Sequence, residues 1–123
     1  MRSFGENPES VARHGIAFAR GLEDNGVLTV AKHFPGHGNP STDSHKMLPT
    51  VNKTRSELKM CELLPFRQYI DAGLSGIMVG HLYVPAIDKR RVPSSMSQAH
   101  VTGLLRKELG FEGLIFTDGL AMR

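Results

Sequence analysis

The sequence predicts an α/β fold of about three parallel strands and three helices. Three short, nearly continuous apolar segments, residues 27–31, 75–80 and 113–117, alternate with segments of helical periodicity. The connections between these segments exceed the dozen or so residues that parallel pairing requires. The order helix, strand, helix, strand, helix, strand therefore favours right-handed βαβ units in one sheet.

The first predicted helix begins after Asn7, because asparagine followed by Pro8 is typical of an N-cap with proline at the first helical position. Asn25 and Gly26 end this helix. We expect its inward face to contain Val11, Gly15, Phe18, Ala19 and Leu22. Residues 27–31 then form a strand that we expect to be covered on both faces.

The second helical segment begins with a capping box, Thr54 with Glu57 three residues later. Pro65 is expected to kink or divide this segment, and Gly73 ends it before the strand at 75–80. Cys61 is the only cysteine, which excludes an intrachain disulfide, and its leucine-rich surroundings predict a buried thiol.

The third helix is predicted to follow Ser97, whose hydroxyl can cap it. Val101, Leu104 and Leu105 point inward in this interpretation. Gly110 stops the helix, and the last strand, at 113–117, follows.

Composition narrows the class of protein. The 123 residues are the usual size of a single domain, and no linker divides them. The 15 Lys and Arg residues and 12 Asp and Glu residues are scattered, so we expect no nucleic-acid partner. No apolar run reaches the roughly 18 residues of a membrane span, and the first residues lack a signal-peptide pattern. The sequence does not specify a compartment.

Three strands leave two unpaired edges and too little sheet for the helices. We therefore expect residues 1–123 to be part of a larger α/β domain. For the same reason we expect the chain, when it is isolated, to self-associate.

Reactive side chains follow all three predicted strands. Lys32 and His33 come after the first strand, His81 after the second and Asp118 after the third. The carboxyl ends of parallel strands meet at one edge of a sheet, where ligands bind in such folds. A single histidine or aspartate at such a position is more often structural, but three in register indicate a site.

The segment 32–45 is the densest in chemistry, with a lysine, three histidines and an aspartate held between glycines and prolines. Asp43 and His45 are two residues apart, so in extended backbone the carboxylate can orient the imidazole for proton transfer. Two alternatives remain open for this segment. One is a loop ordered by its own hydrogen bonds, and the other is a zinc or iron site built from His33, His37, Asp43 and His45.

Several motifs resemble one known family. They are Lys-His-Phe-Pro-Gly-His-Gly at 32–38, Asp-Ser-His at 43–45 and Phe-Thr-Asp-Gly-Leu-Ala-Met at 116–122, with further likeness at 2–5, 78–85 and 103–111. Together they resemble glycoside hydrolase family 3, specifically its bacterial β-N-acetylhexosaminidase branch. The resemblance implies that residues 1–123 form about a third to a half of a (β/α)₈ TIM-barrel-like catalytic domain.

The resemblance also implies roles for individual residues. Asp118 would be the nucleophile at the anomeric carbon, and His45 the general acid/base with Asp43 as its partner. The residues expected to bind the sugar are Arg2, Lys32, His33 and His81. Two departures from the family pattern, Asn39-Pro40 and Gly119, remove no catalytic group.

The activity that this resemblance implies is removal of terminal β-linked N-acetylglucosamine through a covalent glycosyl-aspartate, without cofactor or metal. The expected substrates are cell-wall muropeptides or chitin-type oligosaccharides, and the isolated chain is expected to be inactive. A β-glycoside phosphorylase is an alternative, because a neutral imidazole repels an anionic acceptor less than a carboxylate does. Two further alternatives are a metal-dependent hydrolase and a non-catalytic sugar-binding or assembly fragment.

Overall fold

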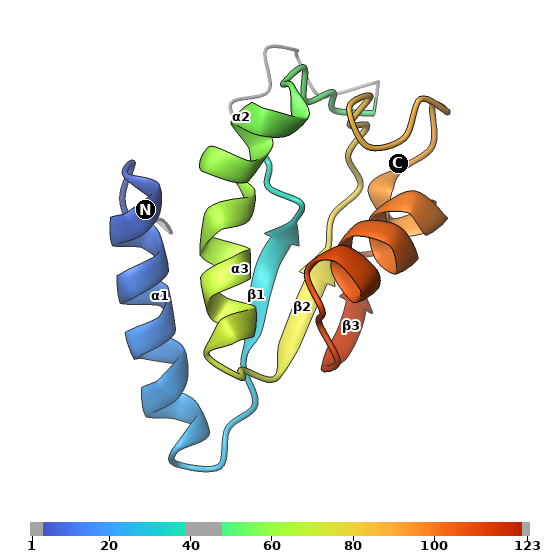
Figure 1. The fold of residues 1–123 in the computed structure, drawn as a ribbon. Helices are drawn as coiled ribbons and strands as arrows, with labels where there is room; N and C mark the ends of the chain where they lie inside the picture. The colour runs from blue at the N-terminus through green and yellow to red at the C-terminus, as the bar shows by residue number, and fades with distance from the viewer. Residues whose placement is uncertain (1–3, 39–47, 122–123) are drawn as a thin grey trace.

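One parallel sheet organises the chain. The computed structural model describes residues 4–38 and 48–121. Along the chain lie α1 (Pro8–Glu23), β1 (Val30–Phe34), α2 (Arg55–Met60), α3 (Leu63–Asp71), β2 (Gly76–Val79), η1 (Ser94–Met96), η2 (Ala99–Glu108) and β3 (Leu114–Thr117). The three strands are parallel in the order β1-β2-β3 (Figure 1). The predicted α/β fold is confirmed.

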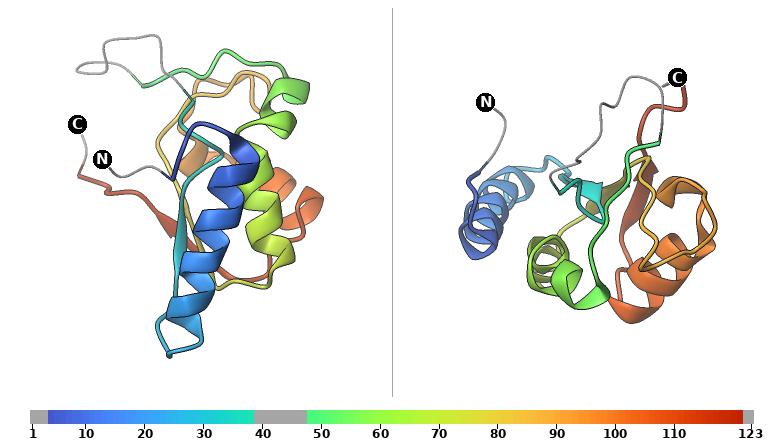
Figure 2. Two further views of the ribbon diagram at one scale, coloured as in Figure 1. Left: turned by 90° about the vertical axis from the view of Figure 1, so that its left-hand side faces the viewer. Right: turned by 90° about the horizontal axis from the view of Figure 1, so that it is seen from above.

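The helices cover one face of this sheet (Figure 2). The opposite face carries apolar side chains that remain exposed: Val30 is 38% exposed, Leu114 52% and Phe116 41%. These residues share a face because Gly76 of β2 pairs with both Val30 and Leu114. The expectation that the strand at 27–31 is covered on both faces is therefore wrong for the part of the chain that the structure describes, whereas the residues of β2 are buried or half-buried.

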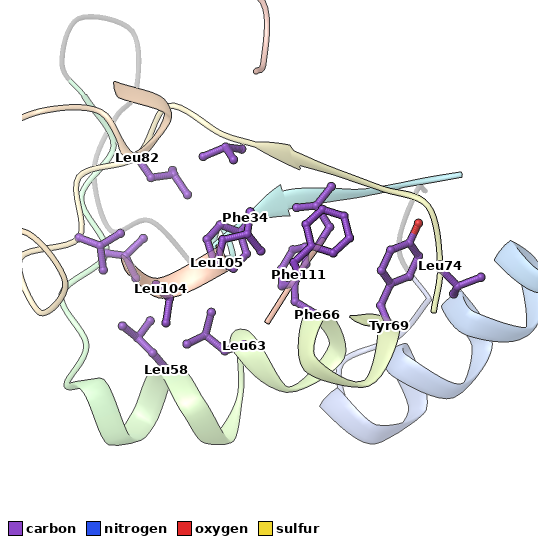
Figure 3. Close-up of a cluster of buried hydrophobic side chains, with 14 of the residues drawn as sticks. Phe34, Leu58, Leu63, Phe66, Tyr69, Leu74, Leu82, Leu104, Leu105 and Phe111 are labelled. Atoms are coloured by element: carbon purple, nitrogen blue, oxygen red, sulfur yellow. The ribbon is translucent and has the colours of Figure 1, made fainter. Parts of the chain in front are cut away.

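The core lies between the sheet and helices α3 and η2 (Figure 3). Phe34 is fully buried, and its ring meets that of Phe66 edge-on with centroids 5.3 Å apart. Leu63 and Leu105 fill the space around these rings and are at most 1% exposed. Burial of each such side chain contributes about 1.5–3 kcal/mol, so this cluster holds the helices to the sheet.

Helix α1 begins as predicted, with the Asn7 side chain accepting a hydrogen bond from the Ser10 amide at 3.0 Å. Its inward face agrees with the prediction at Ala19 and differs at Phe18 and Ala12. Ala12 and Ala19 are buried, whereas Phe18 is 60% exposed and contacts the ring of Phe4. The two small residues allow α1 to lie close to α3, whereas Phe18 lines an open cavity beside them.

The capping box at Thr54 and Glu57 is confirmed, with both reciprocal hydrogen bonds present. The helical segment then breaks at residues 61–62, and Pro65 is the third residue of α3. Proline has no N–H to donate four residues back, so the break precedes it. Cys61 lies at this break and is exposed, which corrects the prediction of a buried thiol.

The third helical segment is a π-helix rather than an α-helix. The Leu109 amide donates five residues back to the Leu104 carbonyl at 2.9 Å. Ser97 lies before it as predicted, and its hydroxyl accepts from the His100 amide at 3.3 Å. Leu104 and Leu105 are buried, and Gly110, with φ +70°, ends the segment.

Strand β1 lies three residues later than predicted. The segment before it is held to the end of α1 instead, because the Val27 amide donates to the Leu22 carbonyl and the Thr29 hydroxyl donates to Glu23 at 2.6 Å. Lys32 and His33 consequently belong to the strand and not to the loop after it.

Candidate active site

The carboxyl ends of the three strands are tied together by backbone hydrogen bonds that extend the sheet. The Gly80 amide donates to the Phe34 carbonyl at 2.9 Å, and the Asp118 amide donates to the Val79 carbonyl at 3.0 Å. The residues that follow β2 and β3 are therefore fixed beside the end of β1, as the sequence predicts.

His33 and Asp118 meet at this edge. The distance from His33 Nε2 to Asp118 Oδ2 is 3.6 Å, and the two side chains are 29% and 24% exposed. His33 is in β1 and Asp118 directly follows β3, so the contact spans the end of β2. An imidazole thus lies against a carboxylate at a place that solvent reaches.

Gly80 makes this approach possible. A Cβ atom at Gly80 would lie 3.1 Å from the Cβ of His33, closer than most Cβ contacts. The absence of a side chain at the end of β2 therefore leaves room for His33 to pass across toward Asp118.

The Asp118 carboxylate is also held by its own backbone. Its Oδ1 accepts a hydrogen bond from the Gly119 amide at 2.7 Å. One oxygen is thus fixed by the turn after β3, while the other faces His33. This arrangement orients a carboxylate without burying it.

His81 follows β2 and contacts the same turn. Its Nε2 lies 3.0 Å from the Gly119 carbonyl oxygen, and its Nδ1 lies 2.6 Å from Ser95 Oγ. Ser95, in η1, was not among the residues that the sequence indicated. A pair of adjacent serines in a proline-containing loop is a weak signal, and only the fold brings it to His81.

The last residue of β1 and the two residues after it have a structural role. Phe34, Pro35 and Gly36 are buried, and Gly36 has φ +119°, a conformation that favours glycine. A Cβ at Gly36 would lie 2.5 Å from that of Glu62, so a larger residue would not fit. Glu62 in turn pairs with Lys53, and this hydrogen bond raises the pKa of Lys53.

Three of the predicted site residues, Arg2, Asp43 and His45, lie outside the described residues. Lys32 is exposed on β1, one residue before His33. The rings of His33 and His37 are in contact, with centroids 5.5 Å apart. Within residues 4–38 and 48–121, no group of three or more histidine, cysteine or acidic side chains is placed to hold a metal ion.

A cavity of about 780 Å³ lies between α1, β1 and α3. Its lining is largely apolar and includes Phe18, Leu22 and Phe66, with Lys32 and His33 also contributing. Asp118 and His81 do not line it. The cavity therefore borders the edge where the carboxylate and imidazoles meet, and His33 belongs to both. No helix among the described residues is long and apolar enough to cross a membrane.

Comparison with known proteins gives consistent matches along the whole chain. The family described as the glycosyl hydrolase family 3 N terminal domain matches residues 1–123. A beta-hexosaminidase of Neisseria meningitidis serogroup C is 41% identical over 121 residues, which are 98% of this chain and 33% of that protein. The chain therefore spans about a third of the length of this curated relative.

Solved structures agree with this similarity. A glycoside hydrolase family 3 beta-N-acetylglucosaminidase from a Paenibacillus species superimposes with a TM-score of 0.93 at 45% identity, over 98% of this chain and 23% of that one. A beta-glucoside phosphorylase superimposes with a TM-score of 0.88 at 32% identity, over 96% of this chain and 23% of that one.

Proposed function

Because the chain belongs to glycosyl hydrolase family 3, we propose that residues 1–123 are part of the catalytic domain of a retaining β-N-acetylglucosaminidase. The observation that carries the proposal is the placement of Asp118 at the carboxyl end of β3, with one carboxylate oxygen held by Gly119 and the other facing His33. Similarity to a beta-N-acetylglucosaminidase over 98% of the chain supports the choice of sugar.

In this mechanism Asp118 attacks the anomeric carbon as the bond to the leaving oxygen breaks. The product is a covalent glycosyl-aspartate, which water then cleaves with retention of configuration. His45 gives its proton to the leaving oxygen in the first step and takes one from water in the second, with Asp43 orienting the ring. An imidazole suits this role because its ordinary pKa is near 6.5.

The remaining residues bind the sugar. Lys32 and His33 lie near the carboxyl end of β1, at the same edge of the sheet as Asp118. We assign them, with Arg2, to the hydroxyl groups of N-acetylglucosamine. His33 also contacts Asp118, so in this assignment it lies beside both the sugar and the nucleophile. The proposed substrates are muropeptides or chitin-type oligosaccharides.

The test is turnover of a nitrophenyl N-acetylglucosaminide by the longest reading frame that contains this chain. Asp118→Asn is compared with Asp24→Asn, a matched change at an exposed carboxylate at the end of α1. Loss of turnover in the first variant alone supports the proposal. Equal activity in both variants overturns it.

Phosphorolysis is the second candidate, favoured by the similarity to a beta-glucoside phosphorylase. In that reaction inorganic phosphate replaces water in the second step, so the product is a sugar 1-phosphate rather than a free sugar. Product analysis with and without phosphate separates the two reactions.

We further propose that the 123-residue chain by itself self-associates. Within the described residues, β1 and β3 each pair with one neighbour, and Val30, Leu114 and Phe116 are exposed on the face without helices. Another chain that packs on this face would bury apolar surface and protect the edges.

A further inference from the structure

His81 uses both of its ring nitrogens within the protein. Nε2 lies 3.0 Å from the carbonyl oxygen of Gly119, and Nδ1 lies 2.6 Å from Ser95 Oγ. The ring therefore links Ser95 in η1 to Gly119 in the turn after β3. Neither nitrogen is left in this arrangement for a sugar hydroxyl.

The partners of the ring determine its protonation pattern. A carbonyl oxygen only accepts hydrogen bonds, so Nε2 must carry a proton and donate it to Gly119. In a neutral imidazole the other nitrogen then has a lone pair, and Ser95 must donate its hydroxyl proton to Nδ1. The Gly119 carbonyl thus fixes the tautomer of His81, and the Ser95 hydroxyl stabilises it by donating to Nδ1.

The backbone that carries His81 is fixed by the neighbouring serine. Ser94 is fully buried, and its hydroxyl donates to the Gly80 carbonyl at 2.7 Å and accepts from the Leu82 amide at 3.2 Å. The Ser94 amide donates to the Leu82 carbonyl at 2.8 Å. Ser94 therefore fixes the chain on both sides of His81, while Ser95 orients its ring.

The peptide groups of Gly119 link this system to Asp118. The Gly119 amide donates to Asp118 Oδ1 at 2.7 Å, while its carbonyl accepts from His81. Glycine has wide backbone freedom, so a turn at this position depends on outside contacts for its conformation. Without the bond from His81, Gly119 and the carboxylate that it holds would reorient more easily.

We propose that His81 and Ser95 are positioning residues for Asp118. This inference rests on the proposed function, in which Asp118 is the nucleophile. The Ser95 hydroxyl stabilises the tautomer by donating to Nδ1, the Nε2 proton of His81 holds the Gly119 carbonyl, and the Gly119 amide holds the carboxylate oxygen. The pair acts on the alignment of the nucleophile and not on affinity for the sugar.

The kinetic test uses His81→Leu and His81→Gln in the longest reading frame that contains this chain. Misalignment of a reacting group by about 1 Å can cost about 100-fold, so His81→Leu should lower kcat by roughly that factor with little change in KM. The amide nitrogen of glutamine can replace Nε2 as donor to Gly119, so His81→Gln should retain most of kcat. A raised KM with unchanged kcat would show that His81 binds the sugar, and would overturn the proposal.

Ser95→Ala is compared with Met96→Ala, a change at an adjacent side chain that is 78% exposed. We expect kcat to fall about 10-fold in the serine variant and to stay unchanged in the methionine variant. Equal kcat in both variants would remove Ser95 from the positioning pair.

A readout without activity separates this inference from the proposed function. Nitrogen-15 NMR of the histidine rings in the 123-residue chain reports the tautomer directly. The proposal predicts a proton on Nε2 of His81 in the wild type, and a mixture of tautomers with a shifted Gly119 amide in Ser95→Ala. A proton on Nδ1 in the wild type, or an unchanged Gly119 signal in the variant, would overturn it even if Asp118 proves to be the nucleophile.

Discussion

His33 in β1 and Asp118, the residue after β3, approach each other across the end of β2, with 3.6 Å between Nε2 and Oδ2. The contact depends on Gly80, because a side chain there would meet His33. The same carboxylate receives the Gly119 amide. Asp118 is therefore oriented by its own turn and by a neighbouring imidazole, while it remains accessible to a substrate.

Gly80→Ala tests the importance of this close approach. The added Cβ would lie 3.1 Å from the Cβ of His33, so His33 must shift away from Asp118. We expect at least a 10-fold loss of turnover and about 1–3 kcal/mol of destabilisation from overpacking. Kinetics and urea denaturation of the variant measure both effects.

Gly21→Ala is the matched control, because nothing lies within 4 Å of a Cβ at this position in α1. Alanine favours a helix over glycine by up to about 1 kcal/mol, so this variant should be at least as stable as the wild type and fully active. A Gly80 variant that behaves like the Gly21 variant would contradict the role given to Gly80.

His45→Ala tests the proposed general acid/base. General acid/base assistance is worth about 10²–10⁴ in rate, and it matters most when the leaving group is poor. We therefore expect a large loss in the rate of the first step, formation of the glycosyl-enzyme, with oligosaccharides. The loss with nitrophenyl glycosides should be much smaller. Equal losses with both substrates would indicate that His45 is structural.

His100 predicts a loss of stability in mild acid. Its ring is fully buried, Nδ1 contacts Ser97 Oγ at 2.9 Å, and burial lowers the pKa of His100 to about 4 although Asp88 opposes the shift. Between the folded value and the unfolded value of about 6.5, the unfolded state binds more protons, so the free energy of unfolding falls as pH falls through this window. We therefore expect the free energy of unfolding to be about 2 kcal/mol lower at pH 5 than at pH 7.

The titration of Asp88 does not contribute to the stability change between pH 5 and pH 7. Hydrogen bonds from Arg90 and Ser97 hold the pKa of its carboxyl well below its usual range, so its stabilising effect is lost only at lower pH. Urea denaturation at pH 5 and pH 7 measures the change. His100→Leu should remove most of it, whereas a change at the exposed His14 should leave it in place. An equal pH dependence in wild type and His100→Leu would contradict the assignment.

The sheet face without helices, which exposes Val30, Leu114 and Phe116, predicts self-association of the 123-residue chain. Sedimentation velocity should show a dimer or larger species at micromolar concentration. Phe116→Glu, on the exposed face of β3, should shift the chain toward monomer, whereas Met60→Glu, at a 72% exposed position on α2, should not. A monomer at all concentrations would show that the exposed face does not drive association.

The features that the sequence predicts correctly depend on local chemistry. Asn7 before Pro8 and Thr54 before Glu57 mark helix starts, because caps are satisfied by residues within one turn. The α/β order and the position of Asp118 after β3 follow from the same kind of pattern.

The features that it misses depend on packing between distant segments. The exposure of Phe18 and Cys61 follows from how α1 and the α2–α3 break lie on the sheet. The late start of β1 follows from hydrogen bonds to the end of α1. Ser95 and Gly80 belong to the site only because the fold brings η1 and β2 to His81 and His33.

The most direct test of the account is covalent labelling of the nucleophile. A slow-turnover 2-fluoro glycoside, incubated with the longest reading frame that contains this chain, should leave one sugar attached through an ester. Peptide mass spectrometry should then find the added mass on Asp118, and Asp118→Ala should take up no label. Attachment to any other carboxylate would contradict the assignment of Asp118 as the nucleophile.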